Sequence, residues 1–199
     1  MRTALRLVDD QGLAALTMRA LATELEVSPM ALYNHVRDKD ELVDLMVDLM
    51  VGEVDRSPTQ GDWVTQLRAL ACSYHQALSA HPNLARRYST RVCLGPQQLM
   101  VIDRTVELLL QAGFPPPEAA EAFYALYTYT AGFHQISPLD PPSGTTSHEA
   151  GYYSALPPEQ IPSIIAVSPH LNGVHRSGGF EYGLDTLLTG LQTKLTTCC

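Results

Sequence analysis

Polar and small side chains between Thr17 and Lys39 are the part of the sequence best suited to chemistry on another molecule. In TMRALATELEVSPMALYNHVRDK, apolar residues recur at helical spacing on both sides of Val27. This pattern predicts two short helices joined by a tight turn, with Val27 buried at the corner. Thr17 is the expected N-cap of the first helix and Ser28 that of the second, where Pro29 then occupies the first helical position. The spacing therefore indicates a helix-turn-helix.

The second of these helices, roughly residues 28–36, offers more side chains to a partner than to a core. Small or hydrogen-bonding groups at the N-terminal end of a helix can reach base edges in the major groove of DNA. Tyr33, His35 and Lys39 are the candidates for contacts with the flanking phosphates, which fix register without reading sequence. The side chains expected to point outward from the second helix are Met30, Ala31, Tyr33, Asn34 and His35. We therefore predict that this unit binds double-stranded DNA.

Along the same residues the chain resembles the TetR family of one-component bacterial repressors. LTMRALATELEVSPMALYNHVRDKDELV follows that family's helix-turn-helix pattern without a gap, with Glu26 where a glycine is common in the turn. The resemblance implies that Thr17 and Arg19 contact backbone or base from the helix before the turn. It also implies that Lys39 binds phosphate at the start of the next helix. The other residues expected at the DNA are Ser28, Pro29, Met30, Ala31, Tyr33 and His35. The alternative is a pair of ordinary helices in an α-helical domain.

The charge of the chain counts partly against DNA binding. The net charge is −8, whereas neutralisation of phosphates usually supplies much of the affinity. The distribution weakens this objection, because residues 1–39 carry five basic and five acidic side chains. Residues 40–56 carry six acidic and one basic side chain, so the negative charge begins behind the predicted DNA-binding unit. With few basic residues before the first helix, we expect modest affinity per subunit, with a second subunit supplying the rest.

Composition indicates a folded protein of one or two domains. Of the 199 residues, 45% are hydrophobic and 17% are charged, which disfavours disorder. No apolar run reaches the length of a membrane-spanning helix, and Asp9 and Asp10 interrupt the first apolar stretch as no signal peptide would allow. We expect a cytoplasmic protein. The four cysteines have neither disulfide-scaffold density nor zinc-site spacing, so no metal and no cofactor is predicted.

Helical periodicity extends through the rest of the chain, and no strand pattern is present, so the predicted fold class is all-α. A helix from Asp38 to about Val51, with Glu41 as a capping-box partner, would connect the DNA-binding unit to the remainder. The loop after it gives two predicted domains, 1–52 and 53–199. Residues 137–158 read as a long loop, which is functional or mobile. The other expected helices cover residues 1–11, 63–80, 97–112, 117–136, 159–167 and 180–197.

Residues 63–135 and 180–195 resemble, more loosely, the effector domain of the same family. In that domain, late helices of two subunits form a four-helix bundle, which implies a homodimer reading a palindromic operator. Polar aromatic and ionic side chains on otherwise apolar helices suit a small-molecule site for a hydrophobic or aromatic effector. The candidates are Tyr74, His75, Tyr88, Arg91, Arg104, Tyr124, Tyr127, Tyr129, Phe133 and His134. Tyr88 and Ser89 stand nearest to the metal-binding histidine of the tetracycline-binding relatives, so neither that metal nor that drug is expected here.

The sequence lacks the signatures of common enzymes, including G-x-S-x-G, H-E-x-x-H and a phosphate-binding glycine loop. His148, His170 and His175 follow no recurrent metal-ligand spacing. The favoured interpretation is therefore a dimeric repressor that a small molecule releases from its operator. Two rivals remain at this point: a small-molecule binding protein that keeps an unused DNA-binding head, and an enzyme of unknown chemistry.

Overall fold

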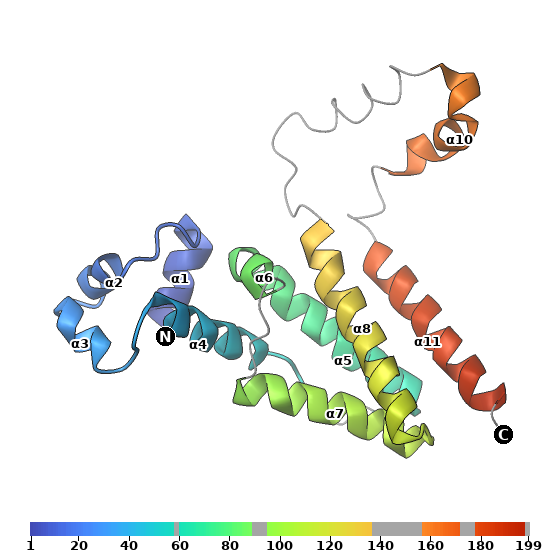
Figure 1. The fold of residues 1–199 in the computed structure, drawn as a ribbon, viewed down its shortest axis with the longest axis horizontal. Helices are drawn as coiled ribbons and strands as arrows, with labels where there is room; N and C mark the ends of the chain where they lie inside the picture. Colours follow the sequence, from blue (N-terminus) through green and yellow to red (C-terminus); the bar gives the residue numbers. More distant parts are fainter. Residues whose placement is uncertain (58–59, 89–94, 137–156, 172–177, 198–199) are drawn as a thin grey trace.

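The computed structural model describes residues 1–57, 60–88, 95–136, 157–171 and 178–197, and all of its regular structure there is helical (Figure 1). The predicted all-α fold class is confirmed. None of the described helices is long and apolar enough to span a membrane. The elements are α1 (Arg2–Gln11), α2 (Met18–Glu24), α3 (Pro29–Tyr33), α4 (Lys39–Val51), α5 (Trp63–Ala80), α6 (Pro82–Tyr88), α7 (Pro96–Ala112), α8 (Pro116–Ile136), the 3-10 turn η1 (Pro158–Gln160), α10 (Pro162–Leu171) and α11 (Gly179–Thr197).

Local signals in the sequence explain most of these boundaries. The Asp62 carboxylate accepts from the Thr65 hydroxyl at 2.6 Å and from the Thr65 backbone N–H at 2.9 Å. Both bonds lower the pKa of that carboxyl group, and the second caps α5. Gly113 ends α7 in the left-handed conformation, with φ 106°, which costs a glycine little. The predicted starts and ends of the long helices therefore agree with the structure to within one residue.

Three expectations differ from the structure. The second helix of the predicted helix-turn-helix is only five residues long, because Asn34 ends α3. Val27 is 43% exposed and not buried, since the corner is closed by a hydrogen bond from its N–H to the Ala22 carbonyl at 2.9 Å. The late short helix begins at Pro162, after η1, and not at residue 159. Most of the expected loop, residues 137–156, lies outside the described residues.

Two hydrophobic clusters hold the helices together. The first joins buried side chains of α1, α2 and α4 to those of α5, α6 and α7, and the second joins α5 and α7 to α8 and α11. Six residues of α4 are buried in the first cluster: Leu42, Val43, Met46, Val47, Met50 and Val51. The head formed by α1–α3 therefore shares one core with the bundle, and the division at residue 52 stays a prediction.

Helices α8 and α11 lie side by side at the end of the bundle away from the head (Figure 1). The Tyr129 hydroxyl donates to the Phe180 carbonyl at 2.8 Å, and only a glycine at 183 leaves room for that phenol. Arg68 of α5 adds an exposed ion pair to Asp185 of α11 at 2.7 Å. These contacts fix α11 against α5 and α8.

Candidate DNA-binding surface and ligand cavity

The helix-turn-helix of the head is built by two side-chain caps. The Thr17 hydroxyl accepts from the Ala20 N–H at 3.0 Å, and the Ser28 hydroxyl accepts from the Ala31 N–H at 3.2 Å. Both caps were predicted from the sequence and are confirmed. Ser28 caps α3, and Pro29 follows at the first helical position, so the start of α3 is sharply defined.

Helix α3 has no buried residue, although it sits on a folded head. Met30 is 73% exposed and Tyr33 is 49% exposed, and such apolar exposure on a short rigid helix usually marks a binding surface. Of the residues predicted at the DNA, only Ala31 and Lys39 are half-buried. The exposed ones are Thr17, Arg19, Ser28, Pro29, Met30, Tyr33 and His35.

Lys39 has a structural partner in addition to its predicted role. Its Nζ donates to the Leu13 carbonyl at 3.2 Å, so the start of α4 is tied to the loop after α1. An ammonium group carries three donors, which leaves capacity for a phosphate. At the same end of α4, Asp38 caps the helix and the Glu41 carboxylate accepts from the backbone N–H of Arg37, which lowers the pKa of Glu41.

Glu26 has a left-handed backbone, with φ 54°, at the turn where glycine is common in the family pattern. This conformation costs a residue with a Cβ roughly 1–2 kcal/mol. The residue is exposed, and its backbone N–H donates to the Thr23 carbonyl at 3.1 Å. The head therefore carries both a strained turn and an acidic group close to its exposed helix.

We expect Glu26→Gly to stabilise the protein by about 1 kcal/mol in chemical denaturation, because glycine adopts positive φ without a steric penalty. The matched control Glu26→Gln removes the charge and keeps the strain, so it should leave the free energy of unfolding almost unchanged. Equal stabilities of the glycine and glutamine variants would contradict the strain at this position.

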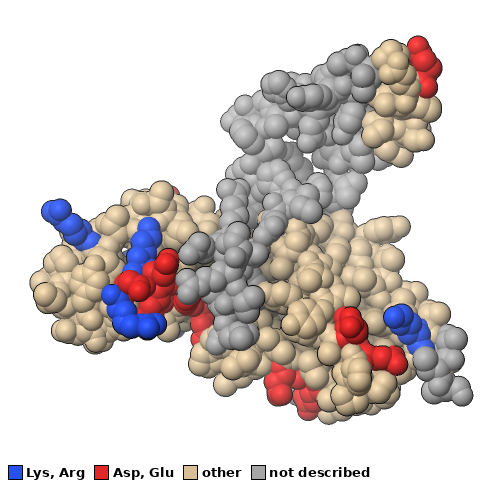
Figure 2. All heavy atoms as spheres, in the orientation of Figure 1, with Lys and Arg blue, Asp and Glu red and all other residues tan. Residues whose placement is uncertain are grey.

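Basic side chains appear on the head and acidic ones predominate on the bundle in the view of Figure 2. Arg37 pairs with Glu41 at 3.1 Å, so one of the few cationic side chains near α3 already has an acidic partner. The exposed guanidinium of Arg19 has no such ion pair among the described residues. The described part of the head therefore presents few unpaired cations, and modest affinity per subunit stays a prediction.

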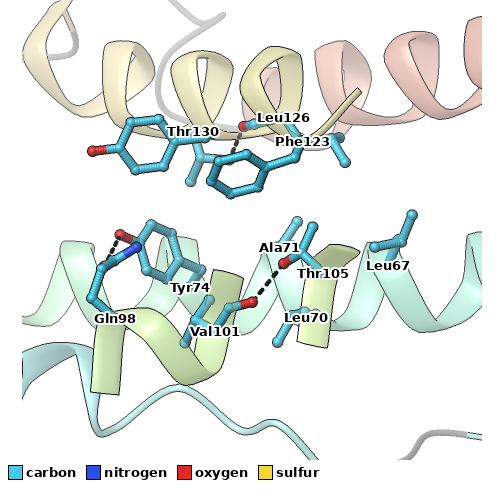
Figure 3. A pocket seen from close by; sticks show the side chains of 11 residues that line it. Leu67, Leu70, Ala71, Tyr74, Gln98, Val101, Thr105, Phe123, Leu126 and Thr130 are labelled. Carbon is cyan, nitrogen blue, oxygen red and sulfur yellow. Dashed lines mark hydrogen bonds between the residues drawn. The ribbon is translucent and has the colours of Figure 1, made fainter. Parts of the chain in front are cut away.

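A small apolar cavity lies between α5, α7 and α8 (Figure 3). It leaves about 40 Å³ of free space, whereas sites for drug-sized ligands occupy roughly 300–1,000 Å³. A larger ligand would therefore have to separate these helices. The lining residues are Leu67, Leu70, Ala71, Tyr74, Gln98, Val101, Thr105, Phe123, Leu126, Tyr127 and Thr130.

One hydrogen bond in the cavity wall joins two different helices. The Tyr74 hydroxyl of α5 donates to the Gln98 side-chain oxygen of α7 at 3.1 Å, and both residues are buried (Figure 3). The two threonines of the wall are satisfied within their own helices, since Thr105 and Thr130 donate to carbonyls one turn earlier. A movement of α7 against α5 would consequently break the hydrogen bond between Tyr74 and Gln98.

The first turn of α7 is held by a carboxylate from α4. Asp48 Oδ1 accepts from the backbone N–H groups of Gln97 and Gln98 at 2.9 and 3.2 Å. It thereby caps a helix whose own N-cap residue, Gly95, has no side chain to do so, and the negative charge suits the positive end of the helix dipole. A Cβ at Gly95 would overlap the Asp48 carboxylate, so the close approach requires glycine. Gln98 thus connects the cavity to α4.

The structure brings only part of the predicted effector set to this cavity. Tyr74 and Tyr127 line it, whereas Tyr124 is 61% exposed on α8 and Arg104 bonds to Gln66 and Glu107 on a polar face of the bundle. The Tyr88 side chain and all of Arg91 lie outside the described residues. Sequence reasoning missed Gln98, whose signal is a lone amide on the buried stripe of α7.

Phe133 and His134 belong to a separate aromatic cluster at the junction of α5, α8 and α11. His75 stacks on Phe180 with ring centroids 4.0 Å apart, and Phe133 packs edge-on against His75. His134 Nε2 lies 2.8 Å from His75 Nδ1, and His134 is only 5% exposed. Burial and the neighbouring His75 lower the pKa of His134 to about 4, and burial also lowers the pKa of His75. The pair is therefore neutral in the folded protein, with one ring donating to the other.

Acidification should destabilise the protein through this pair. Because the pKa of His134 falls from 6.5 to about 4 on folding, its stabilising contribution is complete above pH 6.5 and is lost as the pH falls towards 4. The free energy of unfolding is then lower by about 3 kcal/mol once the pH is below the pKa of the folded state. We expect the free energy of unfolding, measured with denaturant, to fall as the pH is lowered, and to fall less steeply in His134→Gln. The same dependence on pH in both proteins would argue against the neutral pair.

The head and the bundle each match a known family. Residues 1–46 match the family model "Bacterial regulatory proteins, tetR family", and residues 57–195 match "Tetracyclin repressor-like, C-terminal domain". The chain belongs to the TetR family. The resemblance inferred from the helix-turn-helix motif is thus confirmed, and the bundle is of the ligand-binding type found in the tetracycline repressors.

Individual relatives of this TetR-family protein align over almost its whole length. The tetracycline repressor protein class C of Escherichia coli is 31% identical over 98% of this chain and 90% of its own. Apo ActR from Streptomyces coelicolor has a TM-score of 0.85 at 31% identity, covering 100% of this chain and 95% of that one. ActR in complex with actinorhodin has a TM-score of 0.84 at 31% identity, covering 98% and 95%. The protein is accordingly a ligand-responsive transcriptional regulator that acts on operator DNA as a homodimer.

Proposed function

We propose that this TetR-family repressor reads its operator with the exposed surface of α3 and is released by an apolar, aromatic ligand that opens the cavity between α5, α7 and α8. The observation that carries the proposal is the chain of contacts from Tyr74 through Gln98 to Asp48. It connects the cavity wall to α4, whose buried face belongs to the same core as the head. The family consists of transcriptional regulators, so we propose no catalytic step. We place this regulator in the cytoplasm, together with the operator DNA that it binds.

At the DNA, α3 would enter the major groove with Pro29, Met30 and Ala31 towards the base edges. Tyr33 and His35 would bond to the phosphates on either side, and Arg19 and Lys39 would add charge. Thr17 and Ser28 hold the two helix starts through their caps and face the same surface. With a head of zero formal charge, each copy binds weakly, and the twofold partner doubles the contacts.

Homodimerisation would place the exposed side of α8 and α11 against its copy in the partner. Tyr182 of α11 is 79% exposed and Tyr124 of α8 is 61% exposed, and these two helices are neighbours in the bundle. Large aromatic side chains left open on adjacent helices suit the centre of a protein interface. This assignment moves Tyr124 from the predicted effector set to the dimer contact.

Ligand binding would act by separation of the helices, because the free space of about 40 Å³ cannot hold an aromatic molecule of several rings. Displacement of α7 moves its first turn, which the Asp48 carboxylate follows through two charge-assisted hydrogen bonds. Helix α4 then shifts with the head attached. The aromatic walls at Tyr74, Phe123 and Tyr127 favour a flat ligand, and the actinorhodin complex of ActR supports a polycyclic aromatic class.

Tyr33→Ala and His35→Ala should each lower operator affinity about tenfold or more, because each removes a group from the surface that enters the groove. Both residues are exposed, so the dimer and its fold should be unaffected. The measurement is a gel shift on an operator selected from a random DNA pool, with Tyr33→Phe as the control that keeps the ring. Undiminished affinity of both alanine variants would exclude α3 as the reading helix, whereas failure of the unaltered protein to select any DNA from the pool would favour a binding protein with an unused head.

Asp48→Ala should uncouple ligand from DNA. We expect the variant to lose about 1 kcal/mol of stability, as for other removed helix caps. Ligand affinity measured by calorimetry should stay within about threefold, while the effect of ligand on DNA affinity should shrink about fivefold, since a coupling of 1–3 kcal/mol passes through this contact. Asp48→Asn keeps an acceptor oxygen and should retain part of the effect. Actinorhodin is the first compound to test, and full release of Asp48→Ala from DNA would show that coupling takes another route.

A further inference from the structure

A second pocket, with a polar lining, lies on the other side of Leu70 from the ligand cavity. This polar pocket leaves about 240 Å³ of free space between residues 55–57, α5 and α7. Leu70 of α5 is 6% exposed, and it is the one described residue that lines both spaces. A single buried side chain therefore separates an apolar space from a polar one.

The two spaces complement each other in size. The cavity, with about 40 Å³, cannot hold a drug-sized ligand, and the polar pocket alone stays below the roughly 300 Å³ at which such sites begin. Taken together, they approach that limit. Both border the contact between α5 and α7, so a separation of these helices that admits a ligand to the cavity also loosens the packing of Leu70. The two spaces can thus hold two parts of one molecule.

Two arginines supply hydrogen-bond donors to the polar pocket. Arg56 Nη1 donates to the Gln97 side-chain oxygen at 3.0 Å, and Arg104 Nη2 donates to the Gln66 side-chain oxygen at 2.8 Å. Each guanidinium group carries five N–H donors, so both keep donors for a ligand after these bonds. The same bonds hold the two side chains in place, which reduces the conformational entropy that a bound ligand must remove.

The charges in and around the polar pocket balance. Asp55 adds a carboxylate to its wall, and Glu107, which does not line it, pairs with Arg104 at 2.7 Å. The Ser73 hydroxyl accepts from the Asp55 backbone N–H at 2.8 Å and still carries its own proton. An anionic group would face the Asp55 carboxylate, whereas a hydroxyl group both accepts and donates and so can use an arginine and a carboxylate at once. The lining therefore suits an uncharged group with several hydroxyls.

We propose that the ligand is an aromatic glycoside, with its flat body in the cavity and its sugar in the polar pocket. The proposal rests on the proposed function and narrows its ligand class. The sugar hydroxyls accept from Arg104 and donate to Asp55, while Leu70 turns aside to let the glycosidic bond pass between the two spaces. Residues 55–57 follow shortly after α4, so the sugar also contacts the segment that leaves the connecting helix.

The test is isothermal titration calorimetry of the full chain with emodin and emodin 8-glucoside, which share one flat aromatic body. We expect the glucoside to bind about tenfold more tightly, the effect of one or two net hydrogen bonds. Arg104→Gln and Arg56→Gln should each lower this ratio of affinities to about threefold, because each removes charged donors from the polar pocket. Arg68→Gln is the matched control: Arg68 pairs with Asp185 and lines neither space, so the ratio should stay unchanged.

Leu70→Ala should raise the ratio about threefold, because the glucoside no longer has to displace a side chain between the two spaces, whereas both compounds lose the same contact with Leu70. A ratio near one in the unaltered protein, or the unaltered ratio in both Arg104→Gln and Arg56→Gln, would overturn the glycoside. Tighter binding of anthraquinone-2-carboxylate than of the glucoside would also overturn it, in favour of an anion site. If emodin itself fails to bind, the proposed aromatic ligand class is wrong and the glycoside falls with it, so the two failures are distinguishable.

Discussion

The carboxylate of Asp48 at the first turn of α7 is the contact on which the arrangement of head and bundle depends. It satisfies two backbone donors that Gly95 cannot reach, and it does so from a helix whose opposite end begins at the DNA-binding head. Removal of Cβ at position 95 lets the two helices approach this closely. Charge-assisted bonds of this kind are shorter and stronger than bonds between neutral groups, and here they tie α4 to the first turn of α7.

The contacts between the three helices around the cavity are, in contrast, weak. Its free volume is small, its walls are apolar, and one hydrogen bond between helices, from Tyr74 to Gln98, crosses it. A ligand that enters replaces contacts among three helices by contacts with itself, and the cost of their separation reduces its affinity. The same separation is what gives the ligand a preference for one arrangement of the head over the other, without which no ligand could change DNA affinity.

The junction of head and bundle combines contacts of different chemical kinds. Apolar packing of α4 is joined there by the Asn83 amide bond to α1 and by the contacts of the His81 ring with the Asp9 and Glu53 carboxylates. The strained turn at Glu26 and the neutral total charge of the head act on the other side, at the DNA.

The sequence by itself determined the elements: helix starts at Thr17, Ser28 and Asp38, and a helix end at Gly113, follow from local hydrogen bonding and backbone preference, which need no distant residue. It also predicted the DNA-binding surface, because all of the predicted residues lie in one short stretch from Thr17 to Lys39. Only the tertiary structure decided which of the aromatic and polar side chains share a cavity. Tyr74 and Gln98 are 24 residues apart and meet because α5 packs on α7, whereas Phe133 and His134 lie about one turn beyond the cavity residue Thr130 and pack outside the cavity, on His75 of α5 and, for Phe133, on Phe180 of α11. The contacts of Asp48 and His81 likewise join segments distant in sequence, and helical periodicity, which gives a face to each helix, does not say which helix that face will meet.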